Sequence, residues 1–507
     1  MGNEQKLSIQ HLVDQNPWWT ESAPFQNDHL IQRWNQSALR WTPRLAEKFQ
    51  WDLNVIYTLR GPRQVGKTTL LRLRIKKLIE EGVEPRRIFY WTCDLVEDRE
   101  KLAQIIEEYI AFARKFFSDK RLYLFVDEIS SVKDWQYAIK YLYDTGQLRN
   151  CLVLLTGSHS IDLRRATENL AGRRGEVDKL EDKLPDKILC PMKFAEYAET
   201  RSDSIRHLIT DLELLSLSKR LECLIALIEG HAKKEIEELK LHSKELRILF
   251  DDYIITGGIP TAINSYIKTG VISKNIYDTY IELILRDARR WGANETTLRQ
   301  ILRELTKEMG NSISDNNLAK RAEIGSHTTV AHYVEMLKDS FIVSHVYQLK
   351  QKADQRNIKG SRKIYFQDPF IFHSVRSWVS ALDPWKEASL YLQAPENRQR
   401  LVESVVCNHL IRLMFNLSPS AHFEYSDKVF YWQSRRKRSL SFCFKYGARM
   451  APLHILDTRP PGTQDYFPIM DFQKSGHSYK GVMLTRDSFD TRSTCPALPV
   501  HTFLLLI

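Results

Sequence analysis

One stretch of the sequence has the residue types and spacing of a phosphate-binding loop. Residues 61–68 read Gly-Pro-Arg-Gln-Val-Gly-Lys-Thr and satisfy the pattern G-x-x-x-x-G-K-[ST], which belongs between a strand and a helix. The glycines let backbone N–H groups face phosphate oxygens, and the helix start adds its positive dipole end. We therefore expect Lys67 to place its charge at the β- and γ-phosphates of a nucleotide and Thr68 to ligate magnesium. A chance glycine-rich turn is the alternative.

Two acidic residues end an apolar segment further along the chain. Leu122–Val126 is followed by Asp127 and Glu128, and a carboxylate at the carboxyl end of a parallel strand faces a bound ligand. We expect Asp127 to hold magnesium through water, and Glu128 to act as the general base that polarises the attacking water. A solvated acidic turn would explain the same two residues.

Polar residues also follow the next apolar segment, Cys151–Leu155, which ends in Thr156-Gly-Ser158-His159. Ser158 is our first choice, and Thr156 our second, for sensing the γ-phosphate or orienting the water, although a plain strand-to-loop turn fits almost as well. Arg173 and Arg174 could neutralise transition-state charge from the same or a neighbouring subunit, but exposed arginines are more often simply solvated. The expected catalytic residues are Glu128, Lys67, Ser158 and Arg173, and the expected metal ligands are Thr68 and Asp127.

The elements that must position these residues alternate between strands and helices. The expected strands are Val55–Leu59, Arg87–Thr92, Leu122–Val126 and Cys151–Thr156, and the expected helices are Thr68–Glu81, Lys101–Phe117 and Trp135–Tyr143. This order predicts an α/β fold with a mostly parallel sheet covered by helices. The preceding residues are rich in Trp, Gln and Asn and indicate an irregular leader packed on that fold.

The second half of the chain changes character twice. Charged helical patterns from about residue 205 to 250 indicate a helical lid or insertion. Further on, three expected helices and a strand have the order of a winged helix-turn-helix: Leu298–Met309, Asn316–Ala322, Thr328–Lys338 and Ile342–Tyr347. Strand and helix signals after residue 360 then predict a separate α/β domain.

Several motifs together carry a resemblance to a known family. They are Gly61–Thr69, Leu122–Glu128 with Trp135, Thr156–Ser158, Ala171–Arg173, Cys190–Glu196 and Gly257-Gly-Ile-Pro260. The chain thereby resembles the archaeal-type ATPase family of the AAA superfamily, which is related to the STAND signalling NTPases. The resemblance implies ATP and Mg²⁺ as cofactors, and a winged helix followed by a restriction-endonuclease-like domain of unknown function. It also implies that Pro260 approaches the nucleotide base, whereas locally Pro260 could merely stop a helix.

These observations give the expected organisation of the chain. The domains are a leader (1–45), a P-loop AAA ATPase domain (46–199), a helical lid or insertion (200–292), a winged helix (293–350) and a nuclease-like domain (360–507). The expected cofactor-binding residues are Gly61, Pro62, Arg63, Gln64, Val65, Gly66, Lys67, Thr68, Thr69 and Pro260.

The winged-helix segment gives a weaker indication of DNA binding. Ser326 can cap a recognition helix whose first turns present His327, Thr328, Thr329 and His332 outward. Only Lys338 adds a positive charge to this helix, whereas tight DNA binding would call for a strongly basic one. We favour an interdomain packing role over DNA contact. The basic run Arg435–Arg438 fits best as a solvated hairpin tip.

The nuclease-like domain has lost its expected catalytic residues. Glu403 stands on a helix, but the family pattern places an Asp where Ser441 stands, and a Glu and a Lys where His454 and Leu456 stand. Metal-dependent phosphodiester cleavage needs such carboxylates to hold magnesium. We therefore expect no nuclease activity, with the reservation that Asp457 could shift this alignment by a few places.

Composition excludes several other classes of protein. The chain has 507 residues, of which 43% are hydrophobic, and its apolar runs are strand-sized rather than long enough for a bilayer. No apolar signal segment follows the N-terminus, so we expect a cytoplasmic protein with no membrane association. The seven cysteines are scattered singly, which indicates reduced thiols rather than a metal ribbon. The net charge of +11 is spread along the chain and does not by itself indicate nucleic-acid binding.

The sequence thus predicts a nucleotide-dependent molecular switch that hydrolyses Mg-ATP, slowly or in response to a partner. Its state would pass through the lid and winged helix to the C-terminal domain. The alternative is a nucleic-acid-binding regulator or defence protein whose DNA contact is gated by ATP. The expected partners are ATP and an unidentified protein, with DNA binding and homo-oligomer formation left open.

Overall fold

The computed structural model describes residues 9–21, 24–158, 170–350, 355–357, 360–417, 425–434, 437–474, 476 and 478–507. Within this part the chain forms two compact units, the first ending at Cys190 and the second beginning at Pro191. His159 and the first two arginines of the 435–438 run lie outside the described residues.

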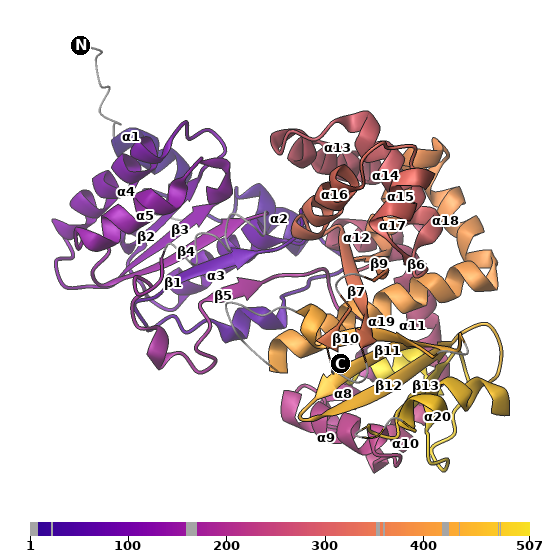
Figure 1. Ribbon diagram of the computed structural model, residues 1–507. Helices are drawn as coiled ribbons and strands as arrows, with labels where there is room; N and C mark the ends of the chain where they lie inside the picture. Colours follow the sequence, from indigo (N-terminus) through magenta and orange to yellow (C-terminus); the bar gives the residue numbers. More distant parts are fainter. Residues whose placement is uncertain are drawn as a thin grey trace. The chain divides into compact units, whose positions relative to one another are not determined.

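The first unit is built on a parallel sheet of five strands in the order β2-β3-β4-β1-β5 (Figure 1). The strands are β1 Ile56–Arg60, β2 Ile88–Thr92, β3 Leu122–Asp127, β4 Cys151–Gly157 and β5 Asp186–Ile188. Almost every strand residue is buried, as expected for a parallel sheet covered on both faces. The α/β fold predicted from the sequence is confirmed, and β5 is an addition to the four expected strands.

Three helices follow the strands of this sheet: α3 Lys67–Glu80, α4 Arg99–Arg114 and α5 Trp135–Asp144. Helices α4 and α5 pack against each other (Figure 1). Asp98 caps α4 by accepting a hydrogen bond from the backbone N–H of Lys101.

The leader completes the edge of the sheet. It contains two short helices, α1 Ile9–Gln15 and α2 His29–Asn35, and Asp28 caps the second. The Asn16 amide donates to the carbonyl of Tyr90 at 3.0 Å and accepts from its N–H at 2.7 Å, as a neighbouring strand would. The indoles of Trp18 and Trp19 both donate to the carbonyl of Ile88. The leader therefore satisfies the outer backbone groups of edge strand β2.

The second unit begins with seven helices: α7 Phe194–Arg201, α8 Asp203–Asp211, α9 Leu217–Ile228, α10 Lys234–Leu241, α11 Ser243–Thr256, α12 Pro260–Thr269 and α13 Lys274–Arg290. The helical pattern expected from about residue 205 to 250 is divided among α8, α9, α10 and α11. Glu213 and Gly230, both at positive φ, lie in the turns that follow α8 and α9.

The remaining elements of the second unit form a nine-stranded mixed sheet and its covering helices. The strands are β6 Ser312–Ile313, β7 Val343–Lys350, β8 Gln355–Arg356, β9 Arg362–Phe366, β10 Val429–Gln433, β11 Ser439–Tyr446, β12 Arg449–Leu456, β13 Val482–Thr485 and β14 Ala497–Pro499. The helices are α14 Glu295–Glu308, α15 Asp315–Arg321, α16 His327–Asp339, α17 Pro369–Ser380, α18 Pro384–Gln393, α19 Pro395–Leu417, α20 Phe467–Gln473 and α21 Val500–Leu504.

Strand β7 joins two segments that the sequence analysis treated separately. It pairs with β9 on one side and runs parallel to β10 on the other, with Tyr347 opposite Phe430. Residues 293–350 and 360–507 therefore share one continuous sheet. Side chains from β7, β10, β11, β12 and α20 also meet in one apolar core cluster.

Candidate nucleotide site

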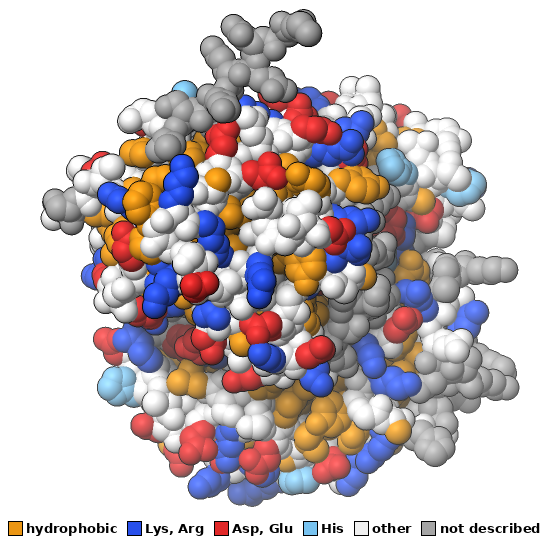
Figure 2. Space-filling model, turned by 90° about the vertical axis from the view of Figure 1, so that its left-hand side faces the viewer, with side chains coloured by type: hydrophobic (Ala, Val, Ile, Leu, Met, Phe, Trp, Pro, Cys, Tyr) orange, Lys and Arg blue, Asp and Glu red, His pale blue; other side chains and the backbone are white. Residues whose placement is uncertain are grey.

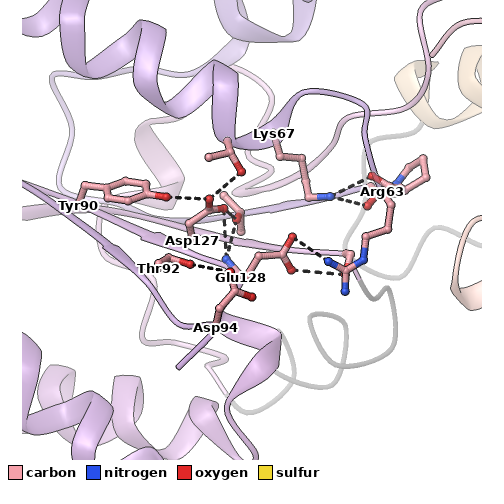
Figure 3. Close-up of polar contacts among 12 residues, drawn as sticks. Arg63, Lys67, Tyr90, Thr92, Asp94, Asp127 and Glu128 are labelled. Carbon is pink, nitrogen blue, oxygen red and sulfur yellow. Dashed lines mark hydrogen bonds and ion pairs between the residues drawn. The ribbon is translucent and has the colours of Figure 1, made fainter. Parts of the chain in front are cut away.

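The phosphate loop lies between β1 and α3, as its sequence pattern requires. Gly66 has a φ of +95° immediately before Lys67, which is the first residue of α3. At Gly61 a Cβ atom would lie 1.9 Å from the carbonyl oxygen of Leu189, so the start of the loop accepts only glycine. The Lys67 side chain is 6% exposed, and its ammonium donates to the carbonyls of Gly61 at 2.9 Å and Pro62 at 3.0 Å (Figure 3).

Asp127 ends β3 as a buried carboxylate surrounded by hydroxyl groups. It is 2% exposed and accepts hydrogen bonds from Thr68 at 2.7 Å, Tyr90 at 3.1 Å and Thr156. These donors come from α3, β2 and β4, so the carboxylate joins three elements. Burial, followed by the charge of Asp127, raises the pKa of Tyr90, which keeps its hydroxyl protonated as a donor.

Glu128 is held beside the phosphate loop. Its backbone has a φ of +50°, and its N–H donates to the Thr156 hydroxyl at 3.1 Å. On the side chain, Oε1 lies 3.6 Å from Nη1 of Arg63, and Oε2 accepts from Ser158 at 3.5 Å. Figure 3 shows the Arg63 guanidinium facing the Glu128 carboxylate. The carboxylate therefore lies between a loop residue and the residue that follows β4.

The structure thus brings together most of the residues selected from the sequence, and it adds one residue, Tyr90, and one contact, between Arg63 and Glu128. The order of the strands explains why these residues lie close together. Strands β3, β4 and β1 are neighbours, and their carboxyl ends share one edge of the sheet. Tyr90 was not predicted as a site residue. It lies on β2, which pairs with β3, so a polar side chain near the end of a neighbouring strand was the available signal. The pairing of Arg63 with Glu128 was also missed, because Arg63 was considered only as a loop residue.

The two arginines proposed for transition-state stabilisation have other partners. Arg173 donates from Nε to Asp144 at 2.6 Å, at the end of α5. Arg174 is buried and pairs with Asp186 of β5 at 2.9 Å. The catalytic role expected for Arg173 stays a prediction.

The Cys190–Glu196 motif and the Gly257–Pro260 motif, which are distant in sequence, meet inside the second unit. The N–H of Gly258 donates to Asp368 at 2.7 Å, and its carbonyl accepts from the N–H of Met192 at 2.8 Å. The Tyr253 hydroxyl donates to the carbonyl of Met192 at 2.8 Å. Asp368 is buried, and burial raises its pKa to about 6 against the opposing effect of the backbone N–H groups of Gly258 and Phe370, which donate to the carboxylate. Pro260 is the first residue of α12, and its contact with a nucleotide base stays a prediction.

Two residues aligned with a nuclease centre, Glu403 and Ser441, are in contact in the second unit. Glu403 on α19 accepts hydrogen bonds from Tyr365 at 3.0 Å and Ser441 at 3.4 Å, and Lys363 lies 3.9 Å from the carboxylate. Burial lowers the pKa of His454, whose Nδ1 has no hydrogen-bond partner among the described residues.

The two other positions of that alignment serve different roles. Leu456 packs against the apolar core cluster of the sheet. Asp457 is buried and accepts from Arg398 at 2.7 Å. Across the described ranges, no group of three or more His, Cys, Asp or Glu side chains is placed to hold a metal ion.

Helix α16 has the cap expected of it and three of the four exposed residues expected of it, whereas Thr329 is half-buried. The Ser326 hydroxyl accepts from the N–H of Thr329, and His327, Thr328 and His332 are exposed. Within the basic run, the described Arg438 pairs with Asp471 at 2.9 Å.

Comparison with known proteins bears on the first unit. Residues 54–198 match the family model described as an AAA domain, and they contain the phosphate loop, Asp127 and Glu128 in the geometry given above. This segment is an AAA-type P-loop domain. Beyond the AAA domain, residues 247–382 match a domain of unknown function, DUF8612.

No helix within the described ranges has the length and apolar character needed to cross a membrane.

Two uncharacterized proteins are similar over much of the chain. One, MJ1637 of Methanocaldococcus jannaschii, is 24% identical over 66% of this chain and 67% of its own length. The other, from Haemophilus influenzae, is 23% identical over 61% of this chain and 64% of its own length. The chain therefore matches about two thirds of each relative.

Among solved structures, the Walker-type ATPase PABY2304 of Pyrococcus abyssi is 16% identical with a TM-score of 0.39, covering 66% of this chain and 93% of that one. Cdc6p of Pyrobaculum aerophilum is 12% identical with a TM-score of 0.26, covering 72% and 98% respectively.

Proposed function

We propose that the first unit binds ATP with Mg²⁺ and hydrolyses it. The observation that carries this proposal is the 2.7 Å contact between the Thr68 hydroxyl and Asp127, next to the loop and to Glu128. A hydroxyl and a carboxylate in contact offer the oxygen ligands that Mg²⁺ prefers. Thr68 and Asp127 would hold the ion, which neutralises phosphate charge when bound. The surrounding residues therefore fit the cofactor.

The roles of the other residues follow from their positions. The ammonium of Lys67 donates to two loop carbonyls in this structure. On nucleotide binding it would donate to the β- and γ-phosphates instead. Glu128 would accept a proton from the attacking water, and Ser158 would orient that water or the γ-phosphate. The positive φ and the Thr156 contact fix the backbone from which Glu128 acts.

A continuous stretch of chain supports the further proposal of a switch. In the first unit, the N–H of Leu189 donates to the carbonyl of Arg60 at 2.8 Å, and its own carbonyl lies against Gly61. In the second unit, Arg412 donates to the carbonyl of Pro191, and Met192 is held by Gly258. Movement of the phosphate loop on nucleotide binding would therefore be passed along residues 189–192 to the Gly258–Asp368 contact.

We propose that the nuclease-like sheet is a docking surface rather than a nuclease. The charge of Lys363 supports the absence of nuclease activity, because Lys363 lies beside Glu403 where a metal ion would otherwise balance the carboxylate. Ser441 and His454 add no second carboxylate to the cluster. Residues 293–350 would act as a winged helix packed within the same sheet.

A second candidate function is ATP-gated DNA binding through α16. The exposed His327, Thr328 and His332 favour it, because they can reach phosphates or base edges. Against it, α16 carries a single Lys, Lys338, and that side chain pairs with Glu335. On the face drawn in Figure 2, the described Lys and Arg side chains are interspersed with Asp and Glu. We rank this function below the ATPase switch.

One experiment separates the two functions. ATP hydrolysis by the full chain is measured with and without duplex DNA, alongside the molecular mass in solution. The full chain is needed because β7 of residues 293–350 pairs with β10. Hydrolysis that is independent of DNA supports the switch. A salt-sensitive shift of duplex DNA that requires ATP supports the second function.

A further inference from the structure

The two cations of the phosphate loop have different partners. Lys67 faces the loop carbonyls, whereas Arg63 reaches out of the loop to Glu128, the expected general base (Figure 3). The Arg63 and Glu128 side chains are only 16% and 15% exposed, so solvent screens their attraction incompletely. This ion pair links the residue that would bind phosphate to the residue that would activate water.

This ion pair matters for catalysis because Glu128 is held at both its backbone and its side chain. Its backbone is fixed by Thr156, and Ser158 contacts the carboxylate oxygen that is not nearest Arg63. The guanidinium and the hydroxyl each take up one side of a carboxylate that has further acceptor sites on both oxygens. Loss of the Arg63 contact would open the Oε1 side of Glu128 to the attacking water.

A γ-phosphate is a stronger competitor for Arg63 than Glu128 is. It carries more negative charge than a carboxylate and offers three oxygens to a planar guanidinium. Arg63 stands four residues before Lys67, in the loop that the γ-phosphate would approach. ADP lacks the γ-phosphate and would leave the ion pair in place.

We propose that Arg63 is a positioning residue that exchanges Glu128 for the γ-phosphate of ATP, so that the base is released only when a triphosphate fills the loop. This inference rests on the proposed ATP-binding function. It predicts that Arg63 and Glu128 are energetically coupled in the binding of triphosphate but not of diphosphate.

A double-mutant cycle tests this coupling in the full chain. The variants are Arg63→Ala, Glu128→Gln and both together, and the probes are a non-hydrolysable imido analogue of ATP and ADP, each with Mg²⁺, by calorimetry. We expect Glu128→Gln to tighten analogue binding roughly 10-fold, because Arg63 no longer has to leave a carboxylate. In the Arg63→Ala background the same change should have no effect, and ADP affinity should be insensitive to Glu128→Gln in both backgrounds.

Two further variants separate this role from a structural one. Arg63→Lys keeps the charge and should restore part of the coupling, and the exposed Arg86→Ala in the same unit should leave it unchanged. Equal tightening by Glu128→Gln with and without Arg63 would overturn the inference while leaving ATP binding intact. A wild-type chain that binds neither nucleotide would overturn the proposed function and this inference together.

Discussion

The hydroxyl of Thr68 donates a 2.7 Å hydrogen bond to the carboxylate of Asp127. It joins the first turn of α3 to the end of β3, two elements far apart in the sequence. The same carboxylate accepts hydrogen bonds from Tyr90 and Thr156, so strands β2 and β4 also fix its position. The rigid placement of these oxygens is what a magnesium site requires.

Lys67→Ala should abolish measurable ATP binding. The change removes a buried positive charge that would form charge-assisted hydrogen bonds to phosphate, so the binding free energy should weaken by at least ~2 kcal/mol. Titration calorimetry checks the affinity, with the surface variant Lys76→Ala of the same helix as the matched control. An unchanged affinity in Lys67→Ala would mean that the loop does not bind phosphate through this lysine.

Tyr90→Phe should destabilise the first unit and weaken nucleotide binding in magnesium. It removes one of the hydroxyl donors to buried Asp127, at a cost of about 1 kcal/mol in the free energy of unfolding. Chemical denaturation measures the stability, and Tyr137→Phe, at a half-exposed tyrosine, is the control. Equal stability of Tyr90→Phe and wild type would show that the hydroxyl contributes nothing to holding Asp127.

Asp368 should make the second unit less stable as the pH rises from about 4 to 6. Burial raises the pKa of this carboxyl to about 6 in the folded chain, from 3.8. Between these two values Asp368 is protonated in the folded chain and ionised in the unfolded chain. Stability is therefore greatest below the unfolded pKa and falls as the pH rises through the folded pKa. The loss should reach about 3 kcal/mol at most.

The comparison with Asp368→Asn isolates this contribution. The variant has no proton to lose, so the difference in unfolding free energy between it and wild type should change across this range and level off above pH 7. Denaturant titrations at pH 4, 5, 6, 7 and 8 give the measurement. A constant difference would show that Asp368 keeps the same pKa in both states.

The full chain should not cut DNA. Lys363 lies 3.9 Å from Glu403, and neither Ser441 nor His454 supplies a second carboxylate. A single carboxylate holds magnesium weakly, because the ion relies on several oxygen ligands. Incubation with supercoiled, linear and single-stranded DNA, with ATP and either Mg²⁺ or Mn²⁺, tests this expectation. Cleavage that disappears in Glu403→Ala or Asp457→Ala would reveal a working site.

The sequence predicted the parts of this fold that depend on local pattern. Leu122–Val126 and Cys151–Thr156 are strands because their apolar runs fit a sheet buried on both faces. The carboxyl ends of such strands share an edge, which is why Asp127 and Ser158 could be placed near the loop before the structure was known.

The contacts that the sequence did not predict depend on partners distant in the chain. The Asn16 amide substitutes for a neighbouring strand at Tyr90, and no periodicity signals a side chain in that role. The pairing of β7 with β10 depends on tertiary packing, so the joint sheet was divided into two domains at the sequence level. Arg63 and Glu128 meet only once the strand order is known.

The most direct test of the account compares ATP hydrolysis by wild type and Glu128→Gln at saturating Mg-ATP. Glutamine keeps the shape of the side chain and removes its capacity to accept a proton, so nucleotide should still bind while turnover falls by roughly 10²-fold or more. Glu107→Gln, at a glutamate of α4 outside the site, is the matched control and should hydrolyse ATP as wild type does. Wild-type turnover in Glu128→Gln would contradict the account, because Glu128 would then not be the base.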